Sequence, residues 1–222
     1  MRCGPGPVVL LILAALPAAA CGTIPRYSEV RENKVEGVNA VKIRAAIWEN
    51  TQIESKDTTF PFAADAGFEL DRYSSFGVEF ERRIPIGDSK QYAVTFAYET
   101  RDMQVENTST PIQGEQIHAG MRRYFGDRAL TAFLAAQLIY HQSLDFPGEL
   151  GLRESDDFLG WGAGGGLNLA LSGHFTIEAT AMYESAPGVK TYKRRTEGPA
   201  APADLEFNFS GPVVYIGLGY HF

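Results

Sequence analysis

Residues 141–154 have the types and spacing that a hydrolase needs. His141 and Ser143 are separated by one residue, and Glu149 and Glu154 follow them. A histidine that accepts the proton of a serine hydroxyl makes that oxygen a nucleophile, and a carboxylate orients the histidine. These residues could therefore cleave an ester or an amide. The alternative is a polar pair that lines the interior of the fold, and the wider sequence favours this second interpretation.

The His-x-Ser pair with a following glutamate resembles the lipid A deacylases, eight-stranded outer-membrane enzymes. This resemblance implies a lipid A-modifying hydrolase with His141 as base and Ser143 as nucleophile. Three features argue against it. Strand alternation sends both side chains inward, away from a membrane-embedded acyl chain. In that family the motif lies near the C-terminus, whereas 79 residues follow Ser143, and Leu144 replaces the expected polar residue. We expect no enzymatic activity.

The sequence offers no pattern for a metal or a cofactor. The four histidines, at 118, 141, 174 and 221, lack the spacing of metal ligands. The glycine-rich run 160–166 lacks the lysine and the helix of a phosphate-binding loop, and we expect its glycines to make room for bulky neighbours. Lysine and arginine total 20 against 27 acidic residues, which gives a net charge of −7 and argues against a nucleic-acid partner.

Two charged segments are candidate binding loops. A loop expected at 186–206 holds a cluster of four cations, Lys190, Lys193, Arg194 and Arg195. These cations could bind the phosphates of lipopolysaccharide or another anionic extracellular ligand. A second loop, expected at 145–157, is acidic and could share divalent ions with lipopolysaccharide. The alternative for both is a solvated loop without a ligand.

The elements that must position these residues are strands, because side-chain polarity alternates with period two in eight segments. Long polar connections are expected at 51–72, 105–115, 145–157 and 186–206, and short turns lie between the other strands. Long and short connections in alternation are typical of an eight-stranded antiparallel up-and-down transmembrane β-barrel. The eight segments are 38–50, 73–86, 91–104, 116–125, 129–144, 158–172, 174–185 and 207–222.

The two faces of these strands differ in chemistry. One parity is apolar and ends in aromatic residues, as a lipid-facing wall with two aromatic girdles does. Arg82 and Arg123 fall on this parity, and either snorkelling or a local bulge would accommodate Arg82. Because a barrel of eight strands has a narrow interior, we expect the charges of the other parity to pair and plug it. These charges are Lys42, Arg44, Glu79, Glu81, Arg83, Glu99, Arg101, Arg122, Glu178 and Glu184.

The N-terminal residues resemble an export signal. Residues 1–20 combine Arg2, a short apolar run and three alanines, and residues 18–21 resemble a lipoprotein lipobox with Cys21 as the lipidation candidate. Ordinary signal cleavage after Ala20 is the alternative. Residues 21–36 read as a periplasmic leader and residues 37–222 as the barrel. Cys21 is the only cysteine left after cleavage, so no disulfide forms within one chain.

The C-terminal segment resembles the signal that assembly machinery recognises in outer-membrane barrels, with Tyr215, Gly217, Tyr220 and Phe222 as its elements. Segments 118–126 and 160–167 resemble strands of the OmpA-like and porin-family barrels. This resemblance implies a protein of the Gram-negative outer membrane that contacts lipid and lipopolysaccharide. This architecture is shared by proteins of different function, so the resemblance does not fix the role. We expect a structural role, or an interaction role through the outer loops. A soluble lipocalin-like barrel with the faces inverted remains an alternative.

Overall fold

The computed structural model describes residues 35, 37–49, 52–55, 68–86, 89–105, 110–126, 129–146, 152–193 and 204–222. The predicted signal peptide, Cys21 and nearly all of the leader lie outside these residues. Among the described residues, no helix is long and apolar enough to cross a membrane.

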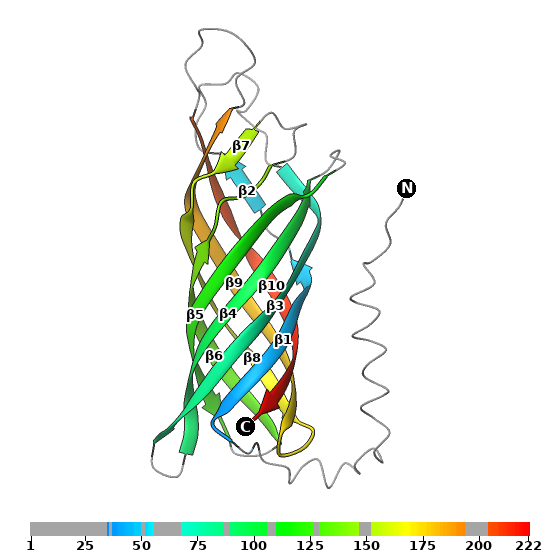
Figure 1. The fold of residues 1–222 in the computed structure, drawn as a ribbon, viewed down its shortest axis with the longest axis vertical. Helices are drawn as coiled ribbons and strands as arrows, with labels where there is room; N and C mark the ends of the chain where they lie inside the picture. Colours follow the sequence, from blue (N-terminus) through cyan, green and yellow to red (C-terminus); the bar gives the residue numbers. More distant parts are fainter. Residues whose placement is uncertain are drawn as a thin grey trace.

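Eight long strands form a closed barrel (Figure 1). The order around it is β1, β3, β4, β5, β6, β8, β9 and β10, all neighbours are antiparallel, and β10 pairs back onto β1. The predicted eight-stranded up-and-down barrel is therefore confirmed. Its strands are β1 (Asn39–Glu49), β3 (Phe68–Ile86), β4 (Ser89–Val105), β5 (Ile112–Phe125), β6 (Leu130–His141), β8 (Phe158–Ala170), β9 (Phe175–Lys193) and β10 (Asp204–His221).

Several strands continue beyond their predicted ends and occupy parts of the predicted loops. β3 begins at Phe68, β5 begins at Ile112, and β9 runs on to Lys193. The loop boundaries expected at 51–72, 105–115 and 186–206 were therefore wrong. Where both faces of a hairpin carry polar residues, backbone pairing continues without any alternation to reveal it.

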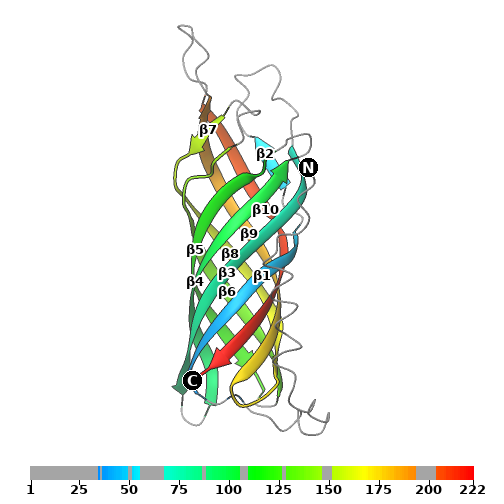
Figure 2. The same ribbon diagram turned by 45° about the vertical axis from the view of Figure 1, so that its right-hand side comes forward.

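Two short strands complete the barrel wall at its outer end, the end that carries β2 and β7 in Figures 1 and 2. β2 (Gln52–Ser55) pairs with β10 and β3, and so takes the place of β1 beyond Glu49. β7 (Leu152–Ser155) pairs with β9 above β8, inside the region expected to be the acidic loop. Ser155 N donates to Leu144 O at 3.1 Å, which joins β7 to the segment after β6. The outer end is thus a continuation of the ring.

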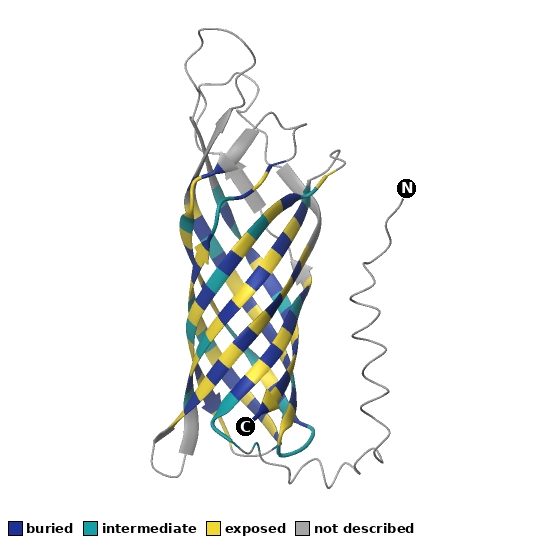
Figure 3. Cartoon of the chain, viewed as in Figure 1, coloured by how far each residue is buried: buried dark blue, intermediate teal, exposed yellow. Residues whose placement is uncertain are grey.

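Alternation along the strands separates two faces, as the chequered pattern of Figure 3 shows. Large apolar side chains of all eight barrel strands are exposed on the outer face, including Leu138 (66%) and Leu159 (67%). Arg82 is also exposed, and its pairing with Val94 and Asn39 is regular, so no bulge turns it inward. Arg123 lies outside as well, over the rings of Tyr92 and Phe125.

The strand alternation changes parity just after β6. His141 is buried, Gln142 and Ser143 are half-buried, and Leu144 then takes a buried position. Leu144 lies over Gly114, where a Cβ would come 2.5 Å from its Cδ2. The prediction that Ser143 faces inward with His141 was therefore wrong, because this contact shifts the side-chain parity by one residue.

The pairing of β1 with β10 closes the ring of strands, and this seam is tight at the lower end of the barrel. Asn39 N donates to Phe222 O at 3.1 Å, and Phe222 N donates to Asn39 O at 2.9 Å. Gly37 lies directly against the Phe222 backbone with a φ of +79°, a conformation that suits glycine. The short turn after β5 uses Gly126 at a φ of +95° in the same way.

Candidate functional site

The interior of the barrel gathers all ten charged side chains assigned to the inward parity. They come from β1, β3, β4, β5 and β9, and each is at most 7% exposed. Five are cationic and five are anionic, so their formal charges cancel. Burying so many ions is tolerable only where they pair closely, because each isolated ion would lose its hydration.

Lys42 and Arg122 hold the lower half of this network together. Lys42 Nζ lies 2.7 Å from both Glu81 Oε2 and Glu178 Oε2. Arg122 contacts Glu79 at 2.8 Å, Glu178 at 2.9 Å and Glu81 at 3.0 Å. Each cation therefore faces several carboxylates, and the loss of one cation would leave more than one anion uncompensated.

Aromatic side chains support the network from below. The Tyr124 hydroxyl donates to Glu81 Oε2 at 2.6 Å, and Arg83 Nε lies 3.1 Å from Glu81 Oε1. The guanidinium of Arg83 lies 4.4 Å from the centre of the Tyr124 ring, and that of Arg122 lies 5.0 Å from the Phe133 ring. Tyr124 and Phe133 were not singled out from the sequence, although their inward parity already indicated them.

Arg44 links this lower group to an upper one. It contacts Glu79 at 3.0 Å and is also hydrogen-bonded to Glu99. Gln116 Nε2 donates to Glu99 Oε2 at 3.1 Å, and His118 Nε2 lies 3.4 Å from the same oxygen. The ionic contacts thus run along the interior from β1 and β3 to β4 and β5.

Glu184 is the centre of the uppermost ionic contacts. It receives Arg101 Nη2 at 3.2 Å, Gln137 Nε2 at 3.2 Å and the Tyr215 hydroxyl at 2.7 Å. Tyr215 therefore has a structural role in the interior. Of the four predicted assembly-signal residues, Tyr215 and Gly217 face inward, while Tyr220 and Phe222 are exposed on the outer face.

The glycine-rich segment of β8 makes room for this filling. A Cβ at Gly166 would lie 2.7 Å from Phe133 Cζ, and one at Gly162 would lie 3.1 Å from Gln137 Cγ. The glycines therefore allow Phe133 and Gln137 to reach the centre of the barrel. They lie on a strand in the barrel wall, as part of the packing of the interior.

Above the ionic contacts, the interior becomes apolar. The buried side chains there are Met103, Ile112, Ile139, Leu144, Phe146, Ala186, Val189 and Phe209. The His141 ring stacks on Phe158 at 4.3 Å between centroids, and Phe158 stacks on Phe209 at 6.2 Å. We call this set the outer core, and it lies in the interior toward the end that carries β2 and β7.

The two residues of the predicted catalytic pair lie in different surroundings. His141 is 3% exposed and lies inside against Phe158. Ser143 lines a cavity on the outer wall, and its backbone N–H donates to Asp157 Oδ1 at 3.0 Å. Glu149 lies outside the described residues. Among the described residues, no hydrogen bond joins the side chains of His141 and Ser143, although a proton transfer would require them to be in contact.

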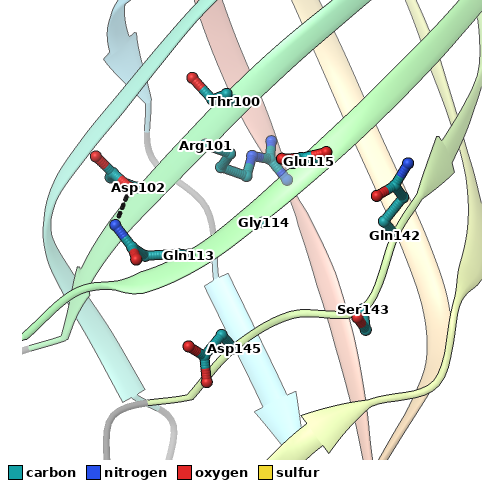
Figure 4. Close-up of a pocket in the computed structure, with 9 residues that line it drawn as sticks. All are labelled: Thr100, Arg101, Asp102, Gln113, Gly114, Glu115, Gln142, Ser143 and Asp145. Atoms are coloured by element: carbon teal, nitrogen blue, oxygen red, sulfur yellow. Dashed lines mark hydrogen bonds between the residues drawn. The ribbon is translucent and has the colours of Figure 1, made fainter.

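The cavity beside Ser143 has a volume of about 390 Å³ and a polar lining (Figure 4). We call it the rim cavity. Its walls come from the upper parts of β4 and β5 and from the segment after β6. Gln113 Nε2 donates to Asp102 Oδ1 across it at 3.1 Å. The lining residues are Thr100, Arg101, Asp102, Gln113, Gly114, Glu115, Gln142, Ser143 and Asp145.

Two of the four cations of the predicted loop lie in a strand. Lys190 and Lys193 belong to β9, where Lys190 pairs with Glu206 and Lys193 with Leu152. Arg194 and Arg195 lie outside the described residues. The expectation that all four cations occupy one loop was therefore wrong, because the β9–β10 hairpin extends through both lysines.

Comparison with known proteins identifies the architecture. No family model matches the chain, and no curated protein matches its sequence. Among solved structures, Neisserial surface protein A matches with a TM-score of 0.52 and 18% identity, over 84% of this chain and all of that one. The outer membrane protein OprG from Pseudomonas aeruginosa matches with a TM-score of 0.56 and 15% identity, over 86% of this chain and all of that one.

A third structure, the outer membrane protein AlkL in lipid bilayers, matches with a TM-score of 0.59 and 11% identity, over 90% of this chain and 96% of that one. The chain has the fold of the small outer-membrane barrels. At these identities the likeness concerns the fold, and the role of the protein must be argued from its own residues.

Proposed function

We propose that the protein is an integral barrel of the Gram-negative outer membrane, with a structural or surface-interaction role and no enzymatic activity. The observation that carries this proposal is the inversion of polarity across the barrel wall. Ten charges lie inside and are paired, while the apolar side chains of eight strands lie outside. The lipocalin-like alternative requires the opposite arrangement, in which charges face water and apolar residues line a cavity.

The outer face is too apolar for a protein surrounded by water. Soluble monomers rarely expose a continuous apolar patch of more than a few hundred Å². Here apolar side chains are exposed around the whole ring, and Trp161 and Tyr183 on neighbouring strands lie 6.1 Å apart near its upper edge. A bilayer covers such a belt and favours tyrosine and tryptophan at its two interfaces.

Gel electrophoresis of unboiled and boiled membrane fractions tests this placement. A closed barrel resists detergent until it is heated, so we expect the unboiled protein to migrate differently from the boiled protein. Refolding is then expected to require detergent or lipid. Refolding in plain buffer, with no heat-dependent shift, would refute the membrane assignment.

From the paired interior we expect that the protein does not act as a general pore. Ionic contacts fill the middle of the interior, and the outer core lies toward its upper end. We expect proteoliposomes that contain the protein to remain impermeable to small sugars in a swelling assay. Swelling at a rate similar to that of a general porin would contradict a plugged interior.

Partners of the barrel would act at its two ends. We expect assembly machinery to recognise the last residues of β10 and Phe222, so that Phe222→Ala lowers the amount of assembled protein in the outer membrane. Lys190, Lys193, Arg194 and Arg195 are the candidates for contact with lipopolysaccharide phosphates or another anionic ligand. Mass spectrometry of the mature N-terminus would establish whether Cys21 carries lipid.

A further inference from the structure

A groove crosses the apolar outer face of the barrel below the rim cavity. It has a volume of about 670 Å³ and runs over β4, β5, β6 and β8. Three exposed alanines form its floor: Ala136 pairs with Ala163, and Ala119 lies one step along on β5. Larger exposed side chains, Met121 on one side and Leu138 and Trp161 on the other, form its walls. We call it the alanine groove.

The alanine groove and the rim cavity lie on the same part of the wall. Along β5 the outward side chains run from Ala119 in the groove through Ile117 to Glu115 in the cavity. Ile117 pairs with Tyr98 on one side and with Tyr140 on the other. The Tyr98 hydroxyl is hydrogen-bonded to the side chain of Glu115, and the Tyr140 hydroxyl donates a hydrogen bond to Asp157. Along β5, Ile117 is the outward side chain between groove and cavity, and the hydroxyls of both flanking tyrosines bond toward the rim.

The charges of the side chains that line the rim cavity indicate which lipid head group would fit there. The exposed lining side chains include the carboxylates of Asp102, Glu115 and Asp145. Arg101 is the cation of this lining, and its guanidinium is turned inward, where it contacts Glu184 at 3.2 Å. A head group at this level therefore faces carboxylates, amides and hydroxyls, which favour an ammonium over a phosphate.

We propose that this face binds a membrane lipid with a primary ammonium head group, with one acyl chain in the alanine groove and the ammonium in the rim cavity. Both volumes lie within the range of about 300–1,000 Å³ that is usual for sites of small ligands. The proposal rests on the membrane placement proposed above. Acyl chains cover the whole outer face in a bilayer, so the specific feature is the coupling of a recessed groove to an acidic cavity.

The fluorescence of Trp161 can report which lipid lies in the groove, because Trp161 is part of the groove wall. The chain has 2 tryptophans, so one substitution removes the other signal. In a Trp48→Phe variant, Trp161 reports alone. The protein is inserted into vesicles of phosphatidylcholine that contain either phosphatidylethanolamine or phosphatidylglycerol with bromine on the acyl chains. Bromine quenches tryptophan on contact. We expect the ethanolamine lipid to be enriched beside Trp161 about three- to fivefold over the glycerol lipid, as one partly exposed ion pair would provide.

Two substitutions separate the parts of the site. Ala136→Leu fills the groove and is expected to remove the enrichment, whereas Ala179→Leu, at another exposed alanine on β9, retains it. Asp145→Asn removes one carboxylate of the cavity and is expected to reduce the preference for the ammonium head, whereas Asp156→Asn at the same rim retains it. The heat-dependent shift on gels confirms that each variant is folded.

The outcomes separate this proposal from the membrane placement. If no brominated lipid quenches Trp161, the protein is not inserted, and both proposals fail. Equal quenching by the ethanolamine and glycerol lipids would refute the ammonium site alone. An enrichment that persists in both Ala136→Leu and Asp145→Asn would also refute it, because neither the groove nor the cavity would then be responsible.

Discussion

The interior of the barrel consists of two regions with opposite chemistry. In the middle, ten charged side chains pair with one another behind an apolar outer wall. At the outer end, Met103, Ile112 and Phe209 are buried, while outward neighbours such as Asp102 and Gln113 are polar and exposed. In the middle, polar residues lie inside and apolar residues outside, which is the reverse of a soluble protein. At the outer end, the distribution is that of a soluble protein.

In the membrane placement proposed above, this difference marks where the bilayer ends. Each barrel strand has one face toward the interior and one toward the surroundings of the barrel. Where the outward face is covered by lipid, the inward face can carry ionic residues. Along β4 the change comes between Tyr98 and Asp102. The outer end then resembles a small soluble domain built onto the barrel, with its own apolar core.

The largest expected effect is the loss of a cation from the middle region. Arg122→Ala leaves Glu79, Glu81 and Glu178 short of a partner, and breaking a buried ion pair costs about 3–5 kcal/mol. We expect little protein to fold, as measured by the fraction that shows the heat-dependent shift.

The neighbouring arginine is the matched control for this substitution. Arg123 lies on the outer face against two aromatic rings, and Arg123→Ala is expected to cost less than about 1 kcal/mol. Similar losses of stability in the two variants would contradict this prediction. They would show that an arginine contributes equally on the inner and the outer face of the wall.

A substitution in the outer core is expected to act locally. Met103→Ala opens a cavity among apolar side chains and costs about 2–4 kcal/mol. Because the ionic region below keeps its own contacts, we expect the outer end to become sensitive to protease while the shorter, protected barrel still shows its heat-dependent shift. Loss of the whole barrel at once would mean that the two regions unfold as one unit.

Tyr215→Phe tests one neutral contact of the ionic region. It removes the hydroxyl that donates to Glu184 at 2.7 Å, and we expect a loss of about 2 kcal/mol in urea unfolding from lipid vesicles. Arg101 and Gln137 continue to contact Glu184, so the fold is retained. A loss as large as that of Arg122→Ala would argue against this ranking of charged and neutral contacts.

The smallest expected effect is that of salt. Ion pairs buried in the interior are screened far less than pairs at a surface. Raising the salt concentration from low values to 1 M is therefore expected to change the free energy of unfolding by less than about 0.5 kcal/mol. A large decrease would indicate that bulk solvent reaches Lys42 and its carboxylates.

Sequence alternation predicts the middle region well, since the ten charged side chains there fall on inward positions and the large exposed apolar side chains fall on outward ones. It assigned Lys42, Arg122 and Glu178 to the interior without any knowledge of their partners. It does not predict which carboxylate each cation contacts, because those distances depend on the register between strands far apart in the chain.

The same reasoning fails at the outer end for a physical reason. Outside the apolar belt the outward face no longer has to be apolar, so β2, β7 and the upper part of β9 lack a clear pattern. The inward shift of Leu144 depends on its contact with Gly114 on β5, a neighbour that alternation within one segment does not reveal. That shift is what separates Ser143 from His141.

The seam between the first and last strands sets the order of events during biogenesis. One edge of β1 pairs with the neighbouring β3, but its other edge finds a partner in β10, with Ala40 beside His221 and Glu49 beside Val213. The ring therefore cannot close until nearly all of the chain has been made, and closing so large a loop is slow. Until then, strands with one apolar face and open edges are exposed to aggregation. The yield of folded protein accordingly depends on how well these open strands are kept apart as well as on the final stability of the barrel.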